Sequence, residues 1–278
     1  MLGNVFSPRW ARARRGDATV SGLDFSTVNV ALRSKAVDRW ALTERARESV
    51  ERSADHLTIG ASHLAWCGDD LVATIDERTA PWGSLVRGTV RVTPICNTDR
   101  SFDLDPDGLH VWSPRIPLAR IEVDLTEPRV RFSGTGYVDA NHGRTPLEDT
   151  FASWSWSRVS NHRGTAIRYD VTLRDGTERT LALRMRGGAL EADHPEPKVL
   201  LPSTRFGLVR PIRGEARGDA VPRVVRTLED GPFYARSMIE TTLDGARAHG
   251  IHETVSLDRF RSPWVQWLLQ FRMRAESP

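Results

Sequence analysis

The chain has 278 residues, of which 39% are hydrophobic and 27% charged, which predicts a soluble globular protein of two domains or one large β domain. Its formal net charge is only +3 and its arginines are interleaved with carboxylates, which favours solvated faces with local ion pairs over a nucleic-acid-binding surface. No run of eighteen apolar residues suggests a membrane-spanning helix, and two cysteines are too few for a disulfide framework or a multi-cysteine metal site.

The N-terminal third contains one helix candidate followed by strands. Residues 1–15 include basic residues but no apolar stretch before a small-residue cleavage site, so we expect no secretory signal. Residues 43–56, TERARESVERSADH, form the best helix candidate, with Thr43 as its N-cap. Residues 56–77 then alternate between apolar and polar side chains, which predicts three strands with a tight turn at Gly68–Asp70.

The same alternation continues through most of the chain and predicts an all-β, antiparallel architecture. Strands are expected at 84–95, 118–125 and 128–137, and hairpins around Asp175–Gly176 and Asp244–Gly245. The join near 141–150 suggests two β domains, 1–145 and 146–278, each a barrel or a sandwich with little helix. Residues 259–274, RFRSPWVQWLLQFRMR, are interpreted as a terminal strand of the second barrel, with an interfacial membrane anchor as the alternative.

Three segments carry polar and aromatic residues that a packed strand does not need: LHVWSP (109–114), GYVDANHG (136–143) and FASWSWSR (151–158). Residues two apart on a strand share a face, which pairs the following side chains: His110 with Trp112, Tyr137 with Asp139 and Asn141, and Trp154 with Trp156. Each segment also has a purely structural interpretation, as a half-buried His–Trp pair, a glycine-rich turn and core tryptophans.

Several blocks of this sequence together resemble the carotenoid 1,2-hydratase (hydroxyneurosporene synthase) family. The most specific block is GTGYVDANHGRTPLEDTFASWSWSR, residues 134–158. The segments NVFSP, DGLHVWSPRIPLARIEVDL and HETVSLDRFRSPWVQWLLQFRMR agree with the family in order, so the resemblance covers nearly the whole chain. It implies two lipocalin-like β domains in tandem, a fold that hosts more than one reaction.

The resemblance implies addition of water to the terminal C1–C2 double bond of acyclic carotenoids such as neurosporene and lycopene, with no cofactor and no metal. The functional residues of the family fall on His110, Trp112, Tyr137 and Asp139. Protonating an isolated alkene requires an acid, and we take Asp139 as that acid, with His110 exchanging a proton with water, although these two roles could be reversed. Trp112, Trp154 and Trp156 would face the carbocation, and Asn141 would contact substrate.

A carotenoid is insoluble in water, so the resemblance also implies peripheral contact with the cytoplasmic face of a membrane, including intracytoplasmic membrane, or with other carotenoid enzymes. Two other functions remain open at this stage. One is a non-catalytic lipocalin-like carrier of a hydrophobic ligand, which would not need polar groups converging in one pocket. The other is a pericyclase on the same fold, which would need hydrogen-bond donors but no dedicated acid.

Overall fold

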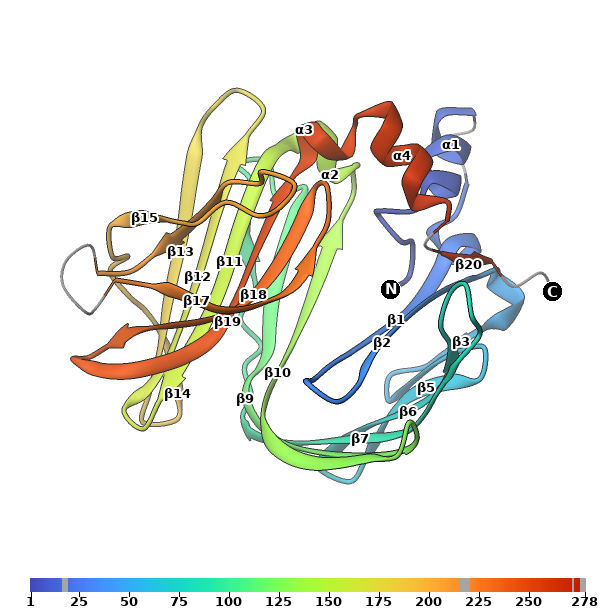
Figure 1. Cartoon of the computed structure of the whole chain (residues 1–278), viewed down its shortest axis with the longest axis horizontal. Helices are drawn as coiled ribbons and strands as arrows, with labels where there is room; N and C mark the ends of the chain where they lie inside the picture. The colour runs from blue at the N-terminus through green and yellow to red at the C-terminus, as the bar shows by residue number, and fades with distance from the viewer. Residues whose placement is uncertain (17–19, 216–220, 272, 276–278) are drawn as a thin grey trace. The chain divides into compact units, whose positions relative to one another are not determined.

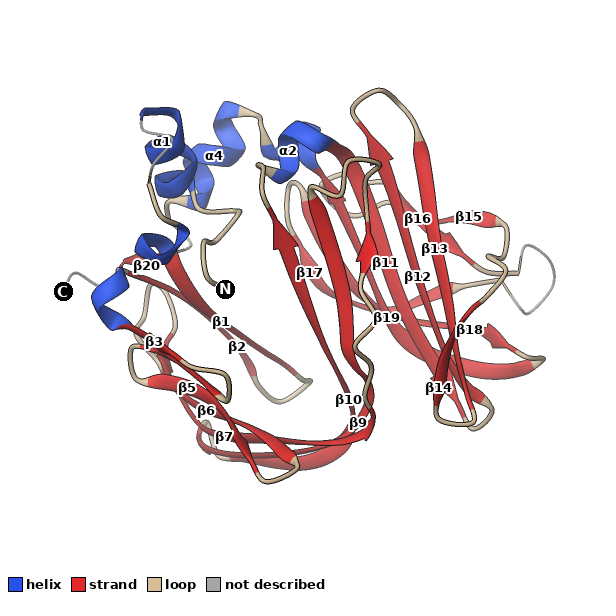
Figure 2. Ribbon diagram, turned by 180° about the vertical axis from the view of Figure 1, so that it is seen from behind, coloured by secondary structure: helices blue, strands red, loops and turns tan. Residues whose placement is uncertain are grey.

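The computed structural model describes residues 1–16, 20–215, 221–271 and 273–275, and strands make up most of it (Figures 1 and 2). Within these ranges the chain forms two compact units. The first unit contains Met1–Asn97, Leu118–Val138 and the segment that begins at Gln266. The second contains Thr98–Pro117 and Asp139–Val265. Two long strands, β9 (His110–Glu127) and β10 (Val130–Gly143), therefore contribute residues to both units.

The first unit is built on two sheets. The smaller has the strand order β1-β2-β20, and the larger has the order β10-β9-β7-β6-β5-β4-β3, with β8 (Phe102–Asp103) paired to β9. The bounds of these strands are β1 Ser26–Arg33, β2 Asp38–Arg45, β3 Val50–Arg52, β4 His56–Ile59, β5 Ser62–Cys67, β6 Asp70–Arg78, β7 Leu85–Cys96 and β20 Arg274–Ala275. The predicted succession β4, β5 and β6 with a turn at Gly68–Asp70 is confirmed, and Gly68 has the positive φ of 64° that this turn requires.

The helix predicted for residues 43–56 is wrong. This segment contains the end of β2, a short 3₁₀ turn at Arg47–Ser49 and β3, and Thr43 lies within a strand. Arg45 and Glu77 form a buried ion pair with two hydrogen bonds, of 3.0 and 3.1 Å. The charges of this segment suggested a solvated helical face, but tertiary partners allow Arg45 to lie inside the protein.

The second unit is built on a seven-stranded antiparallel sheet with the order β14-β13-β12-β11-β19-β18-β17. A two-stranded sheet, β15-β16, packs on one face of it, and the hydrophobic core between them includes Val159, Leu201, Ile212 and Ile239. The strands are β11 Phe151–Asn161, β12 Gly164–Leu173, β13 Glu178–Arg186, β14 Ala189–Ala192, β15 Lys198–Leu201, β16 Arg210–Arg213, β17 Arg223–Asp230, β18 Tyr234–Leu243 and β19 Ala246–Ser256. Both predicted hairpins, β12–β13 and β18–β19, are confirmed.

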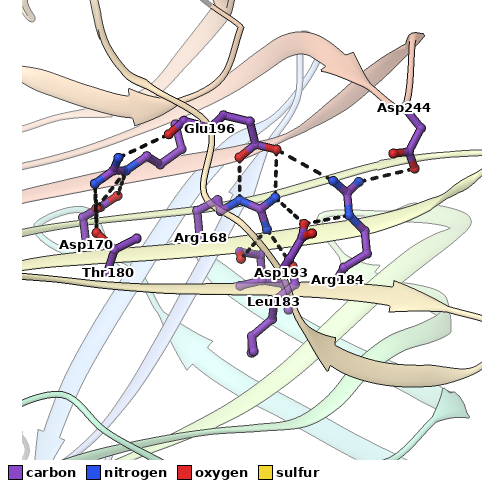
Figure 3. A network of polar contacts seen from close by, with 10 residues as sticks. Arg168, Asp170, Thr180, Leu183, Arg184, Asp193, Glu196 and Asp244 are labelled. Atoms are coloured by element: carbon purple, nitrogen blue, oxygen red, sulfur yellow. Dashed lines mark hydrogen bonds and ion pairs between the residues drawn. The ribbon is translucent and has the colours of Figure 1, made fainter.

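A network of ion pairs lies on the same face of this sheet (Figure 3). The guanidinium of Arg168, whose side chain is 3% exposed, donates to both Asp193 and Glu196 at 2.7 Å. Arg184 also donates to Asp193, at 3.0 Å. The arginines of the chain were expected on solvated faces, and for Arg168 and Arg184 that expectation is wrong. Both are buried, because the carboxylates of Asp193 and Glu196 pair with them.

The glycine-rich stretch 133–143 lies inside β10 and does not form a turn. None of its three glycines has a positive φ. Two of them instead make room for neighbouring side chains, because a Cβ at Gly136 would lie 2.3 Å from Ile121 and one at Gly143 would lie 2.6 Å from Nδ1 of His110. The glycines are therefore explained by close packing rather than by a bend.

The helices are short: α1 Pro8–Gly16, η1 Gly22–Phe25, α2 Leu147–Thr150, α3 Leu257–Phe260 and α4 Pro263–Leu269. The terminal strand expected across residues 259–274 is wrong for most of that range, which forms α3 and α4. Val265 is buried, whereas Trp264, Trp267 and Phe271 are exposed. Arg272 lies outside the described residues. None of the helices in the described ranges has the length and apolar character needed to span a membrane.

Candidate active site

The second unit brings Trp112 and Asp139 together. Nε1 of Trp112, on β9, donates a hydrogen bond to Oδ2 of Asp139, on β10, at 2.7 Å. The indole is fully buried, while Asp139 as a residue is exposed. The two side chains are 27 positions apart in the sequence, so the antiparallel arrangement of β9 and β10 is what places them in contact. The contact joins a carboxylate to the edge of an aromatic surface.

Aromatic rings surround Trp112. The ring of Tyr169, on β12, meets it edge-on, with centroids 5.5 Å apart and an interplanar angle of 85°. Tyr169 also contacts Trp154, on β11, at 5.8 Å and 65°. Phe102 lies 5.9 Å from Trp112 on the paired strand β8. The two contacts of Tyr169 are edge-to-face, a favourable geometry for aromatic side chains, and the three contacts together fix the orientation of the indole.

A row of side chains crosses the seven-stranded sheet beside these rings. Trp156 is opposite Tyr169 on one neighbouring strand and opposite Glu253 on the other, and Glu253 is in turn opposite Arg236. Directly opposed residues of antiparallel strands point to the same face, so all four share one face with Trp154. Oε1 of Glu253 accepts a hydrogen bond from Nε of Arg236 at 2.8 Å, and the Glu253 side chain is 18% exposed.

The electrostatics of this face favour proton retention by buried groups. Burial is the main cause that raises the pKa of Glu253, and the charge of Asp139 raises it further, while Arg236 and a hydrogen bond from Tyr234 act in the opposite direction. Burial also raises the pKa of Tyr169, and the charges of Asp139 and Glu253 add to that effect. The charge of Asp139 therefore contributes to the raised pKa of both Glu253 and Tyr169.

His110 is held in a separate set of contacts. Its Nε2 lies 3.0 Å from Oγ1 of Thr145 and 3.1 Å from Oγ1 of Thr150, and its ring packs against Phe151 at 4.9 Å. Nδ1 has no hydrogen-bonding partner among the described residues and lies against Gly143. Burial lowers the pKa of His110, which leaves the imidazole neutral at neutral pH.

The remaining predicted residues are on the strands that we expected. Tyr137 is half-buried and Asn141 is exposed, each two positions from Asp139 on β10. Trp154 and Trp156 are half-buried on one face of β11. The structure thus connects Asp139 to Trp112 by a hydrogen bond and Trp112 to Trp154 through the ring of Tyr169. His110 is instead held by Thr145 and Thr150.

Comparison with known proteins shows the family of the chain. The model of the carotenoid hydratase CrtC family matches residues 1–277. The chain belongs to that family. The carotenoid hydratase family also includes an acyclic carotenoid 1,2-hydratase of Thiocapsa roseopersicina, 49% identical over 275 residues, which cover 98% of this chain and 67% of that one. A second, from Cereibacter sphaeroides, is 37% identical over 98% of this chain and 95% of its own length.

A solved structure supports the fold of this carotenoid hydratase. The crystal structure of a putative AttH from Nitrosomonas europaea aligns with a TM-score of 0.55 at 14% identity, covering 82% of this chain and 80% of that one. At that identity the likeness concerns the fold alone. The expected lipocalin-like, mostly antiparallel β architecture is confirmed. In the described part of the chain the main sheets have open strand orders, so barrel closure is not observed.

Sequence reasoning missed Tyr169, Glu253 and Arg236. Tyr169 was hidden in an ordinary alternating strand, where an aromatic residue is typical of the core. A signal for Glu253 was present, because it shares a strand face with Ile251 and Val255, and a carboxylate in an apolar row needs an explanation. Its position opposite Trp156 and Arg236 could not be read from the sequence, because it depends on which strands are neighbours in the sheet.

Proposed function

We propose that this carotenoid hydratase adds water across the terminal C1–C2 double bond of an acyclic carotenoid such as neurosporene or lycopene. The product is the tertiary alcohol at C1. Membership of the family supports the reaction class. The observation that carries the site assignment is the hydrogen bond between Trp112 and Asp139, because it joins a carboxyl group to a cluster of aromatic rings. Trp154 in that cluster and Trp156 beside it are half-buried and could contact an isoprenoid chain.

The reaction needs an acid and a surface that stabilises positive charge. A proton is transferred to C2, the π electrons form the new C–H bond, and a tertiary cation remains at C1 until water captures it. Asp139 is the proposed donor of this proton. It is exposed in the protein, so an apolar chain bound against Asp139 would be what removes water from its carboxyl group and favours the protonated form.

Aromatic rings supply the cation-stabilising surface in this proposal. Trp112, Tyr169 and Trp154 are already packed edge to face, and Trp156 shares the sheet face with Tyr169. The negative face of an indole attracts a nearby cation, and this attraction strengthens when water is excluded. The rings would therefore lower the energy of the carbocation without forming a bond to it.

The capturing water must lose a proton, and His110 is the proposed acceptor. Its neutral imidazole and its unpartnered Nδ1 suit a group that takes up a proton and later returns it to Asp139. Tyr137 would position Asp139 or the water, and Asn141 would contact the substrate, since both share the strand face of Asp139. With all transfers complete, the site regains its starting protonation state.

Delivery of a water-insoluble substrate is the second part of the proposal. Trp264, Trp267 and Phe271 are 49%, 58% and 64% exposed on and just after α4, and Arg259 and Arg261 precede them. Exposed aromatics flanked by arginine suit the interface of an anionic membrane. We therefore propose peripheral association with the cytoplasmic face of a membrane, where other carotenoid enzymes would be neighbours.

The proposed function is tested by incubating the purified protein with lycopene or neurosporene in ¹⁸O-labelled water and analysing the products by mass. We expect a 1-hydroxy product carrying the label. The Asp139→Asn variant keeps the shape and the hydrogen bond from Trp112 but removes the acid, so hydration should fall to background while the fold is retained. Substantial hydration by Asp139→Asn would remove Asp139 from the role of acid.

A further inference from the structure

Tyr169 is buried among the aromatic rings of the site, on β12, an interior strand of the seven-stranded sheet. Its ring meets the Trp112 indole edge-on, with centroids 5.5 Å apart and an interplanar angle of 85°. It also meets the Trp154 ring, at 5.8 Å and 65°. Trp112 is 0% exposed and Tyr169 is 8% exposed, so neither ring has much space in which to turn. Tyr169 therefore links the two predicted tryptophans and restrains the indole of Trp112.

The strand that carries Tyr169 is held from its opposite face. Arg168 and Asp170 flank Tyr169 in the sequence and point away from it, because side chains alternate along a strand. Arg168 is 3% exposed and donates to Asp193 at 2.7 Å (Figure 3). Asp170 accepts from Arg213 at 2.6 Å. These ion pairs restrain the backbone on both sides of position 169, which gives the Tyr169 ring a well-defined place beside Trp112.

The orientation of the indole decides whether its N–H reaches the reacting carboxyl group. Nε1 of Trp112 donates to Oδ2 of Asp139 at 2.7 Å. An indole has a single N–H donor and a broad χ2 torsion, so a turn of the ring would move that donor away from Asp139. The contact matters most when Asp139 is ionised, because a hydrogen bond to a carboxylate is stronger than one to a neutral group.

We propose that Tyr169 is a positioning residue for hydration, because its ring keeps the indole N–H of Trp112 on Asp139. This inference rests on the proposed function, in which Asp139 is the acid. As the proton of Asp139 moves to C2, negative charge develops on the carboxyl group, and a donor already in place stabilises that charge. Without the Tyr169 ring, the indole can turn into the vacated space, and this stabilisation is lost.

The position of the indole is tested by NMR of its N–H group. The nine tryptophans of the chain, labelled with ¹⁵N, give nine indole signals, and the Trp112 signal is the one absent from Trp112→Phe. In Tyr169→Leu this signal should move upfield, because a hydrogen bond to a carboxylate deshields the proton. The N–H should also exchange faster with deuterated water. Tyr169→Phe retains the ring that meets the indole, so its Trp112 signal should match that of the wild-type protein.

The same variants test the effect on hydration. Loss of one donor to a developing charge lowers kcat by about a hundredfold or more, so displacement of the donor in Tyr169→Leu should lower kcat by about tenfold to a hundredfold. KM should change little, because Tyr169 is buried. Tyr169→Phe should restore kcat. Trp112→Phe has no N–H to position, so adding Tyr169→Leu to it should lower kcat far less than Tyr169→Leu does alone.

Ile239→Ala is a matched control for the loss of a buried side chain. Ile239 is 1% exposed on the same sheet, and it packs in the hydrophobic core on the opposite face. This variant should have a lower melting temperature, as Tyr169→Leu should, but its Trp112 signal and its kcat should stay at wild-type values. If Tyr169→Leu does not fold, Tyr169→Met takes its place, because a flexible methionine fills more of the vacated space.

The possible outcomes separate this inference from the proposed function. If the wild-type protein forms no hydroxylated product, the proposed function fails and the role of Tyr169 in hydration fails with it. If the wild-type protein hydrates the carotenoid but the ring-less variant keeps either its Trp112 signal or its kcat, the inference alone is overturned. An equal loss of kcat in the Trp112→Phe background also overturns it. Loss of both in Tyr169→Leu, with neither lost in Tyr169→Phe or Ile239→Ala, supports it.

Discussion

Replacement of Gly143 by alanine perturbs the site through a single methyl group. The backbone at Gly143 does not have a positive φ, so alanine brings no conformational strain. The new Cβ would lie 2.6 Å from Nδ1 and 3.0 Å from Cε1 of His110. His110 is 2% exposed and is held by Thr145 and Thr150 on one side and by Phe151 on the other, so it has little freedom to move away.

The size of the effect follows from these distances. Ordinary contact begins at 3.4 Å, so Nδ1 must retreat by 3.4 − 2.6 = 0.8 Å. A retreat of that size along the 3.0 Å hydrogen bond to Thr145 forces the ring to rotate and lose at least one of its threonine contacts. Overpacking of this kind costs about 1–3 kcal/mol of stability, and a misplacement of about 1 Å in a catalytic group can lower the rate by about a hundredfold.

Gly134→Ala is the matched control, because it is on the same strand and its Cβ would meet nothing within 4 Å. We would measure kcat for carotenoid hydration and the thermal melting temperature of both variants. Gly143→Ala should lose both activity and stability, while Gly134→Ala should match the wild-type protein. Wild-type values for Gly143→Ala would refute the idea that this glycine makes room for His110 and that His110 takes part in hydration.

Two further predictions concern stability and membrane binding. His252 is buried, and burial is the main cause that lowers its pKa to about 4. As pH falls below about 6.5, this histidine becomes protonated in the unfolded chain, while in the folded protein it stays neutral until about pH 4. The contribution of His252 to the free energy of unfolding is therefore fully present above pH 6.5 and should decrease by about 3 kcal/mol as pH falls towards 4. Urea titrations at several pH values should show a smaller loss of stability in His252→Gln. The control His249→Gln, at an exposed site, should lose as much stability as the wild-type protein. In vesicle flotation at low salt, the protein should bind phosphatidylglycerol-containing liposomes, and binding should be lost when Trp264 and Trp267 are both replaced by alanine. Binding should survive in Trp82→Ala, which removes a more exposed tryptophan elsewhere. Equal binding by the wild-type protein and both variants would argue against α4 as the anchor.

Alternation of side chains was enough to predict most of the strands. The β4–β6 meander and the hairpins at Asp175–Gly176 and Asp244–Gly245 are local features, in which neighbouring residues determine both the strand period and the turn. The resemblance on residues 134–158 likewise led to the carotenoid hydratase family without any coordinates. Assignment of individual roles to Asp139 and His110 stays a prediction.

The predictions that failed depend on partners distant in the sequence. Residues 43–56 have a helical charge pattern, but Arg45 is buried against Glu77, 32 positions away, and the segment is mostly strand. The stretch 133–143 has the composition of a turn, yet Gly143 is there because His110 lies against it. In both segments, long-range packing outweighed local propensity.

The β architecture, the family and the candidate residues Trp112 and Asp139 could all be predicted from the sequence, because a period of two and a set of motifs are properties of consecutive residues. Which of those residues meet depends on the tertiary structure. The register of β11 with β12 and β19 placed Tyr169 and Glu253 on the face that carries Trp154 and Trp156, and a shift of one residue would have turned them away. Strand order and register arise from the whole sheet, so the residues that flank Trp156 on this face could be found only there.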